Sequence, residues 1–301
     1  DGVVNGCPSH LLEPARTNYI PYSTLDFDGG VKPNGWAIGF STGTFSYEQI
    51  MYKGQKGVKQ TQITDGRSYL DTGSITILAN TTHTLKIQFI LNECIVDDND
   101  VIVLFSNFGV NTSYTFSDID INGVLEVQYN PLSDNIGNIR IGLGSINVED
   151  GGKSLAWTLP QLEQGSYATS YIPTNGTAIT RLAEAVNGAG NTSTFNDLEG
   201  VLMFEGSALA DDSTNRFISL TDGSNDNRVL FGYRASSNQV FARIEGNNSA
   251  SVDLTNVVSD TEIVIKLAIY YDSSFNYKMY LNGFLVDSAI GTDSIIGLNT
   301  L

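Results

Sequence analysis

The chain has 301 residues and carries 33 Asp and Glu residues against 16 Lys and Arg residues, which gives a formal net charge of −17. A field of this sign repels phosphate backbones and anionic headgroups, so we expect neither nucleic acid nor a membrane surface as a partner. The sequence also has no apolar stretch near the roughly 20 residues that span a bilayer, so no membrane insertion is expected. The length exceeds that of one typical core and predicts two domains of about 150 residues each.

The composition suits strands and turns better than helices. It contains 41% hydrophobic, 10% aromatic and 16% charged residues, together with 30 glycines. Two cysteines, Cys7 and Cys94, are too few for a disulfide-dependent scaffold, and we expect both to be free thiols. The chain begins at Asp1 rather than at methionine, so we expect a processed or partial chain with an N-terminal segment over residues 1–10.

Short strand signals recur along the first half of the chain. Thr84–Leu91 alternates apolar residues with Lys86 and Gln88, the period-two pattern of a half-buried strand. Val101–Phe105 is a continuous apolar run, which suits a strand buried on both faces. The pattern is typical of an antiparallel sandwich or jelly roll. The other strands expected here are Ser74–Leu78, Leu125–Tyr129, Asn138–Leu143 and Leu155–Leu159.

The run QLEQGSYATSYIPTNGTAITR, Gln161–Arg181, separates the two halves. It contains Pro173 followed by Thr-Asn-Gly, and because proline fixes φ while glycine permits positive φ, a compact unit should end there. We therefore expect a first domain over residues 11–175, a linker over 176–199 and a second domain over 200–301.

The second half shows a clearer series of strands. The segment KMYLNGFLVDS predicts a hairpin, because Asn282-Gly283 takes up positive φ at both turn positions while Met279 and Leu281 pack. The strands expected here are Gly200–Phe204, Arg216–Leu220, Arg228–Tyr233, Gln239–Glu245, Glu262–Tyr271 and Tyr277–Leu281.

Two motifs carry a resemblance. LLEPARTNYIPYS, Leu11–Ser23, and the run Gln161–Arg181 resemble the segments that flank a galactose-binding-like, carbohydrate-binding-module-like jelly roll in phage virion proteins of tail fibres, head fibres and appendages. In those proteins a concanavalin A-like domain of the laminin G type commonly follows. The resemblance implies an all-β fold with two antiparallel β-sandwich (jelly-roll) domains in tandem. The chain ends at SIIGLNTL, so we expect the second sandwich to be incomplete at its C-terminus.

Catalytic patterns are weak. Gly39–Gly43 (GFSTG) matches GxSxG, but a nucleophile elbow needs a following helix, and the next residues are broken by glycines. A triad would also need one of the two histidines, His10 or His83, and His83 enters a strand. Glycosidases on lectin-like sandwiches use paired carboxylates, as in ExDxxE, and that spacing does not occur here. We therefore expect no enzymatic activity.

Two acidic clusters raise the question of calcium. Asp118, Asp120 and Asn122 imitate the start of an EF-hand loop, but the twelfth position is Tyr129 rather than glutamate, so a turn at Asn122-Gly123 is the preferred interpretation. Asp97, Asp98 and Asp100 form a second cluster, compact enough to hold a hard cation. No cofactor is expected beyond a structural calcium at this second cluster.

Carbohydrate recognition by such folds uses exposed aromatic faces that stack on sugar rings. The candidates in this chain are Trp36, Tyr47, Tyr52 and Tyr69. Trp36 follows a turn and could instead cap the sandwich, as Trp157 in its strand is expected to pack within the core.

Two functional classes remain open. The first is a non-enzymatic virion protein, a fibre, appendage or decoration subunit at the virion surface, which contacts other virion proteins and binds host-surface glycans or braces its neighbours. Such proteins are usually homo-oligomers, often trimers, and this expectation comes from the resemblance. The second is the carbohydrate-binding region of a secreted or cell-surface bacterial protein or polysaccharide-degrading enzyme. The motif pair favours the first class.

Overall fold

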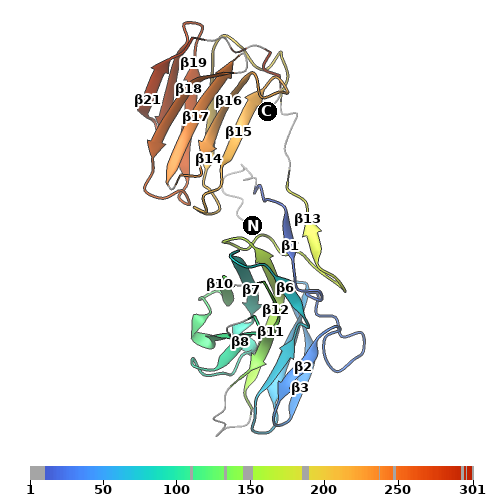
Figure 1. The fold of residues 1–301 in the computed structure, drawn as a ribbon. Coiled ribbons are helices and arrows are strands. Elements are labelled where there is room, and N and C mark those ends of the chain that lie inside the picture. The colour runs from blue at the N-terminus through green and yellow to red at the C-terminus, as the bar shows by residue number, and fades with distance from the viewer. Residues whose placement is uncertain are drawn as a thin grey trace. The chain divides into compact units, whose positions relative to one another are not determined.

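The structure is a computed structural model that describes residues 11–108, 111–131, 134–144, 152–184, 190–236, 238–246, 249–292, 295 and 297–299. It is all-β and consists of antiparallel sheets, which confirms the expected fold class. The chain divides into two compact units, Asp1–Glu184 and Ala185–Leu301 (Figure 1).

The first unit contains two large sheets. One has the strand order β10-β7-β12-β4-β3, and the other has the order β2-β5-β11-β8-β9 with β6 paired to β11. Two short 3-10 helices, η1 and η2, follow β7 and β9. The bounds are β2 (Ala37–Ser41), β3 (Phe45–Tyr52), β4 (Gln55–Gln62), β5 (Ser68–Asp71), β6 (Ile75–Ile77), β7 (His83–Phe89), η1 (Leu91–Glu93), β8 (Val101–Ser106), β9 (Thr112–Thr115), η2 (Phe116–Asp118), β10 (Val124–Tyr129), β11 (Asn135–Leu143) and β12 (Ser154–Gln164).

The core of the first unit lies between these sheets and follows from the alternation in the sequence. On β7, Leu85, Ile87 and Phe89 are buried, while Lys86 and Gln88 stay partly exposed. Both tryptophans belong to this core, with the rings of Trp36 and Trp157 5.1 Å apart. Because the chain has no other tryptophan, its indole fluorescence reports on the first unit alone.

A third sheet of two strands joins the ends of the first unit. β1 (Arg16–Asn18) pairs antiparallel with β13 (Ile179–Arg181), so that Arg16 lies opposite Arg181. The segment 176–199, expected to be a linker, therefore begins with a strand that belongs to the first unit. We call the contact between residues 11–23 and 161–181 the clasp.

Buried polar groups hold the clasp together. The Glu13 carboxylate accepts a hydrogen bond from the backbone N–H of Ser170 (2.7 Å) and forms an ion pair with Arg181 (2.8 Å). The Thr174 hydroxyl donates to the carbonyl of Ile20 at 2.5 Å. The two motifs that carry the resemblance thus meet in space and bond to each other, which gives both a structural role.

The second unit contains two four-stranded antiparallel sheets, with the orders β14-β19-β20-β21 and β15-β16-β17-β18 (Figure 1). Side chains from both sheets form its core, among them Phe231, Ile244, Leu267 and Met279. The predicted hairpin is confirmed, since Asn282 (φ 51°) and Gly283 (φ 87°) connect β20 to β21. The bounds are β14 (Gly200–Gly206), β15 (Arg216–Thr221), β16 (Arg228–Tyr233), β17 (Gln239–Gly246), β18 (Ser249–Val257), β19 (Ile265–Tyr271), β20 (Asn276–Leu281) and β21 (Phe284–Ile290).

Every strand that the sequence predicted is present, with ends that differ by a few residues. The largest difference is β12, which ends at Gln164 rather than at Leu159. The sequence did not predict β1, β2, β3, β4, β5, β9, β13 and β18.

Candidate ligand-binding groove

The structure places two of the four predicted sugar-stacking residues in the interior. Trp36 is 1% exposed and Tyr69 is 6% exposed. The indole N–H of Trp36 donates to the carbonyl of Tyr22 (2.7 Å), so both its ring and its polar atom are used internally. Burial raises the pKa of the Tyr69 hydroxyl above its ordinary value. These two positions are therefore corrected to core residues.

The other two, Tyr47 and Tyr52, lie on β3 at the edge of its sheet. They are five residues apart in a strand without a bulge, so they point to opposite faces. The Tyr47 ring packs against the core and its hydroxyl bonds to Ser68 (2.7 Å). Tyr52 is half-buried beneath the ammonium group of Lys53, which lies 5.2 Å from the ring centroid. The four aromatic residues do not form one surface.

A lysine occupies the centre of the predicted calcium cluster. Nζ of Lys153 lies 2.8 Å from a carboxylate oxygen of Asp97 and 2.8 Å from one of Asp100. Burial acts to lower the pKa of Lys153, but its hydrogen bonds to Asp100 and Asp97 outweigh burial and raise that pKa. The backbone carbonyl of Asp98 accepts a hydrogen bond from the backbone N–H of Ser117. Within the described ranges, no group of three His, Cys, Asp or Glu side chains is arranged to hold a metal ion.

The other acidic cluster forms the turn that the sequence favoured. One carboxylate oxygen of Asp120 accepts hydrogen bonds from the backbone N–H groups of Asn122 (2.9 Å) and Val124 (2.7 Å). These bonds lower the pKa of the Asp120 carboxyl, the bond from Val124 most of all. Asp118 closes a capping box with Thr115. Both carboxylates are thus engaged in local structure.

The residues considered for catalysis are not brought together. Ser41 ends β2, an exposed strand, and the next element is a strand rather than a helix. His83 is buried in β7, and His10 lies outside the described residues, as does Cys7. Cys94 is a free thiol whose pKa burial raises. No helix in the described part of the chain is long and apolar enough to cross a membrane.

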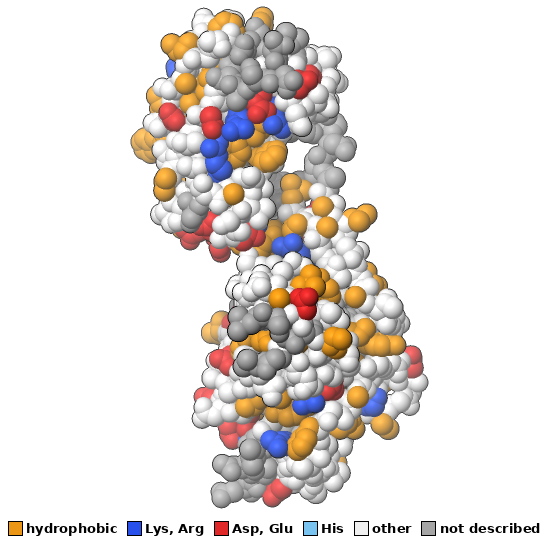
Figure 2. Space-filling view, in the orientation of Figure 1, with side chains coloured by type: hydrophobic (Ala, Val, Ile, Leu, Met, Phe, Trp, Pro, Cys, Tyr) orange, Lys and Arg blue, Asp and Glu red, His pale blue; other side chains and the backbone are white. Residues whose placement is uncertain are grey.

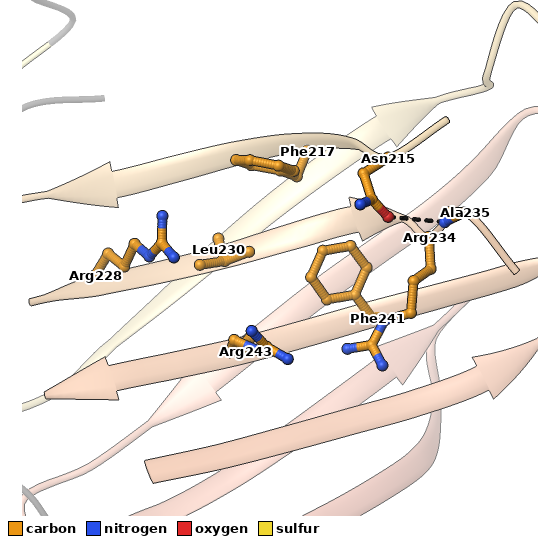
Figure 3. A pocket seen from close by; sticks show the side chains of 8 residues that line it. All are labelled: Asn215, Phe217, Arg228, Leu230, Arg234, Ala235, Phe241 and Arg243. Atoms are coloured by element: carbon orange, nitrogen blue, oxygen red, sulfur yellow. Dashed lines mark hydrogen bonds between the residues drawn. The ribbon is translucent and has the colours of Figure 1, made fainter. Parts of the chain in front are cut away.

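The second unit carries a groove that the sequence analysis did not identify. It has a volume of about 370 Å³ and lies on the outer face of the sheet formed by β15, β16, β17 and β18 (Figure 3). Its lining residues come from the ends and outward positions of β15, β16 and β17: Asn215, Phe217, Arg228, Leu230, Arg234, Ala235, Phe241 and Arg243.

Strand register explains why these side chains meet. Phe217 lies opposite Gly232, and Gly232 lies opposite Phe241, so two phenylalanines flank a position without a side chain. Their ring centroids are 6.4 Å apart. Phe217 is 51% exposed, whereas Phe241 is 4% exposed beneath the guanidinium of Arg234, which lies 4.6 Å from its ring centroid. The groove therefore offers one accessible aromatic face beside a buried floor.

The charged groups of the groove form an alternating chain. Arg228 pairs with Glu245, and Arg234 pairs with Asp253. Arg243 reaches both carboxylates, at 3.4 Å each. Figure 2 shows basic, acidic and hydrophobic side chains gathered together on this face of the second unit. Such a surface combines an apolar patch with directional hydrogen-bond donors.

Part of the groove's lining follows a pattern that the sequence shows. Arg228 and Leu230 share one face of β16 because they are two residues apart, and Arg234 follows directly after the strand. Phe241 and Arg243 share the corresponding face of β17. The sequence shows which residues share a face of each strand. Whether that face points to the core or to solvent, and which residues of β16 and β17 lie opposite each other, depends on the strand register, which only the structure supplies.

No protein-family model matches this chain. The search of curated proteins also found no match.

Proposed function

We propose that this chain is a non-enzymatic structural and adhesion protein of a phage virion that binds host-surface glycans through the groove of its second unit. The motif pair at Leu11–Ser23 and Gln161–Arg181 supports the virion class by resemblance. The tandem antiparallel units suit a protein that presents rigid β-sheet surfaces. The same resemblance supports contacts with other virion proteins and a homo-oligomeric, often trimeric, assembly.

The accessible ring of Phe217 beside the guanidinium groups is the observation that carries glycan binding. A pyranose has apolar C–H faces and a rim of hydroxyl groups, so it pairs with an aromatic face flanked by hydrogen-bond donors. Phe217 supplies the face, and Arg243 supplies donors on the same side of the sheet. The volume of about 370 Å³ lies at the lower end of the range for small-ligand sites, which suits a terminal sugar.

The carboxylates of the groove argue for binding rather than hydrolysis. A glycosidase needs one carboxylic acid and one carboxylate, each able to reach the substrate. The carboxylate of Glu245 forms an ion pair with Arg228, and that of Asp253 forms an ion pair with Arg234. We therefore expect bound sugar to be released unchanged.

A glycan array of bacterial surface polysaccharides tests glycan binding. We expect the intact chain to bind a subset of glycans and Phe217→Ala to lose about fivefold to a hundredfold in affinity, since aromatic stacking contributes about 1–3 kcal/mol. Phe284→Ala is the matched control, because Phe284 is also in the second unit and is 75% exposed but lies on β21 of the other sheet. Equal losses in the two variants, or no bound glycan, would contradict this role for the groove.

Immunogold electron microscopy tests the virion assignment. An antibody against this chain, applied to particles purified from the source, should place gold on one appendage or surface of the virion. Unlabelled particles with signal on cells or in secreted material would instead favour a carbohydrate-binding region of a secreted or cell-surface bacterial protein. The glycan-binding proposal is independent of this outcome.

A further inference from the structure

We infer that the groove selects glycans that carry a negative charge, and that Arg243 binds the anionic group. This inference rests on the proposed glycan-binding function and narrows its ligand class to acidic sugars, with a carboxylate or a sulfate ester as the charged group. It depends on the arrangement of charges around the groove.

The groove concentrates positive charge in a strongly acidic protein. The sequence has eight arginines, and Arg228, Arg234 and Arg243 all line this groove. Among the described residues, the two carboxylates that form ion pairs with them are those of Glu245 and Asp253. Three guanidinium groups against two carboxylates leave one positive charge in excess, and guanidinium stays protonated throughout the physiological range.

Arg243 holds this excess charge. Each carboxylate has a closer arginine partner, Arg228 for Glu245 and Arg234 for Asp253, whereas Arg243 contacts the same two groups only at 3.4 Å. Optimal ion-pair hydrogen bonds of this type are 2.7–2.9 Å long. Nε of Arg243 is buried and has no hydrogen-bond partner in the described part of the chain. Because a buried Nε cannot meet a ligand, the donors that Arg243 can offer to an anionic group are its two terminal nitrogens, whose ion pairs are longer than those of Arg228 and Arg234.

The strand geometry places the donors of Arg243 next to the sugar-stacking surface. Arg243 and Phe241 point to the same face of β17, and Phe241 lies in the same cross-strand row as Phe217. Figure 3 shows the Arg243 guanidinium on the groove side of the sheet. The planar fork of arginine matches the paired oxygens of a carboxylate or a sulfate. A sugar on Phe217 would thus place an anionic substituent within reach of Arg243.

The alternative is that Arg243 only balances the charge of Glu245 and Asp253. In that case neutral glycans would bind as well as acidic ones, and the affinity would depend little on salt. Acidic ligands would instead bind more weakly as ionic strength rises, because screening weakens attraction between charges that are exposed to solvent. The two accounts make opposite predictions for the same measurement.

The test compares acidic glycans with related neutral glycans. Sialyllactose, sulfated lactose and lactose form one series, and oligogalacturonate with its carboxyl methyl ester forms another, both added to the array of bacterial surface glycans. We expect binding to be confined to acidic glycans and to fall as salt rises. Arg243→Gln should weaken it about tenfold to a hundredfold, the range for a lost charged hydrogen bond.

Lys266→Gln is the matched control. It also removes one positive charge from the second unit, but Lys266 lies on the other sheet, where its side chain is 60% exposed and its ammonium group is 3.7 Å from Glu205. This variant should keep full affinity, and circular dichroism should show that both variants fold. Equal binding of neutral and methyl-esterified glycans, unaffected by Arg243→Gln, would overturn the inference while leaving glycan binding intact. Absence of any bound glycan would overturn both.

Discussion

The side chain of Asn18 hydrogen-bonds to the backbone of Ile172, 154 residues further along the chain, at 2.9 Å. The same amide accepts hydrogen bonds from the backbone N–H groups of Ile20 and Leu162, at 3.1 Å each, and it is fully buried. One side chain thus satisfies backbone groups from both ends of the first unit. The clasp is built around this residue.

Asn18→Ala should destabilise the first unit by about 2–6 kcal/mol. The substitution leaves two buried N–H donors without a partner, and each such loss costs about 1–3 kcal/mol. Urea unfolding followed by tryptophan fluorescence measures this unit alone, because both tryptophans belong to its core. Thr17→Ala is the control on the same strand, since it removes only an exposed hydroxyl contact with Thr180. A loss for Asn18→Ala no larger than that for Thr17→Ala would contradict the role assigned to Asn18.

Calcium should not change the stability of the first unit. The ammonium group of Lys153 already lies between Asp97 and Asp100, in the place that a cation would occupy. We therefore expect the same urea midpoint with added calcium and with a chelator. An increase in the midpoint with calcium would reinstate the metal site that the sequence suggested.

Lys153→Met should destabilise the first unit by about 3–5 kcal/mol. Asp100 is 4% exposed, and removing its partner leaves a buried carboxylate without a countercharge. Lys59→Met is the control, because Lys59 pairs with Glu93, which is 42% exposed, and surface pairs contribute about 0–1 kcal/mol. The two variants should differ by at least about 2 kcal/mol in the same fluorescence assay.

His83 should make the first unit less stable as pH falls below neutrality. Burial lowers the pKa of His83 in the folded state, and no hydrogen-bond partner is found for its Nε2 among the described residues. The unfolded chain therefore takes up a proton near pH 6.5 while the folded protein still resists it, so protonation favours unfolding. The stability is fully present above the unfolded pKa, and it is lost as the pH falls from the unfolded pKa through the lower pKa of the folded state.

The measurement for His83 is the slope of the unfolding free energy between pH 7.5 and pH 5.5. The histidine contributes at most about 1.4 kcal/mol per pH unit to this slope. His83→Gln should flatten the slope, even where it lowers stability at every pH. An unchanged slope in the variant would show that other groups cause the acid sensitivity.

The sequence predicted strands with an apolar run or an apolar alternation, but it missed β4, whose buried residues are largely polar. Gln60 and Gln62 on β4 are both buried, and each side chain bonds to a backbone carbonyl, that of Ser68 or Gly66. Such a strand has no apolar alternation to detect, so β4 was missed. β1 and β13 are three residues each and are joined by pairing between distant segments, which leaves no local signal.

The candidate site was harder to predict than the fold because it depends on contacts between residues that are distant in the chain. Exposure of an aromatic residue depends on what packs over it, and Trp36 and Tyr69 follow turns or polar residues although they are buried. The Asp97–Asp100 cluster suggested a metal site in the sequence because its basic partner, Lys153, is more than 50 residues away in the chain. Lys153 contacts the cluster only in the folded protein. The groove depends on the register of three strands.

Gly232 should be essential to the groove and to the second unit. Its φ is +157°, and a Cβ at this position would collide with the backbone carbonyl of Arg216 and approach Cα of Phe217 to 2.7 Å. These contacts are with backbone atoms, which cannot move without breaking the pairing of β15 with β16. Gly232→Ala should therefore separate the two strands and displace Phe217 from Phe241.

Hydrogen exchange measured by mass spectrometry tests this expectation. Gly232→Ala should increase exchange in peptides that cover β15 and β16, and it should abolish glycan binding on the array. Gly223→Ala is the control, because Gly223 also has a positive φ, +93°, but no atom lies within 4 Å of the added Cβ. That variant carries backbone strain of about 1 kcal/mol without a collision, so its strands should keep their protection. Equal protection in both variants would mean that β15 does not need the close approach at Gly232, and that the floor of the groove tolerates a side chain.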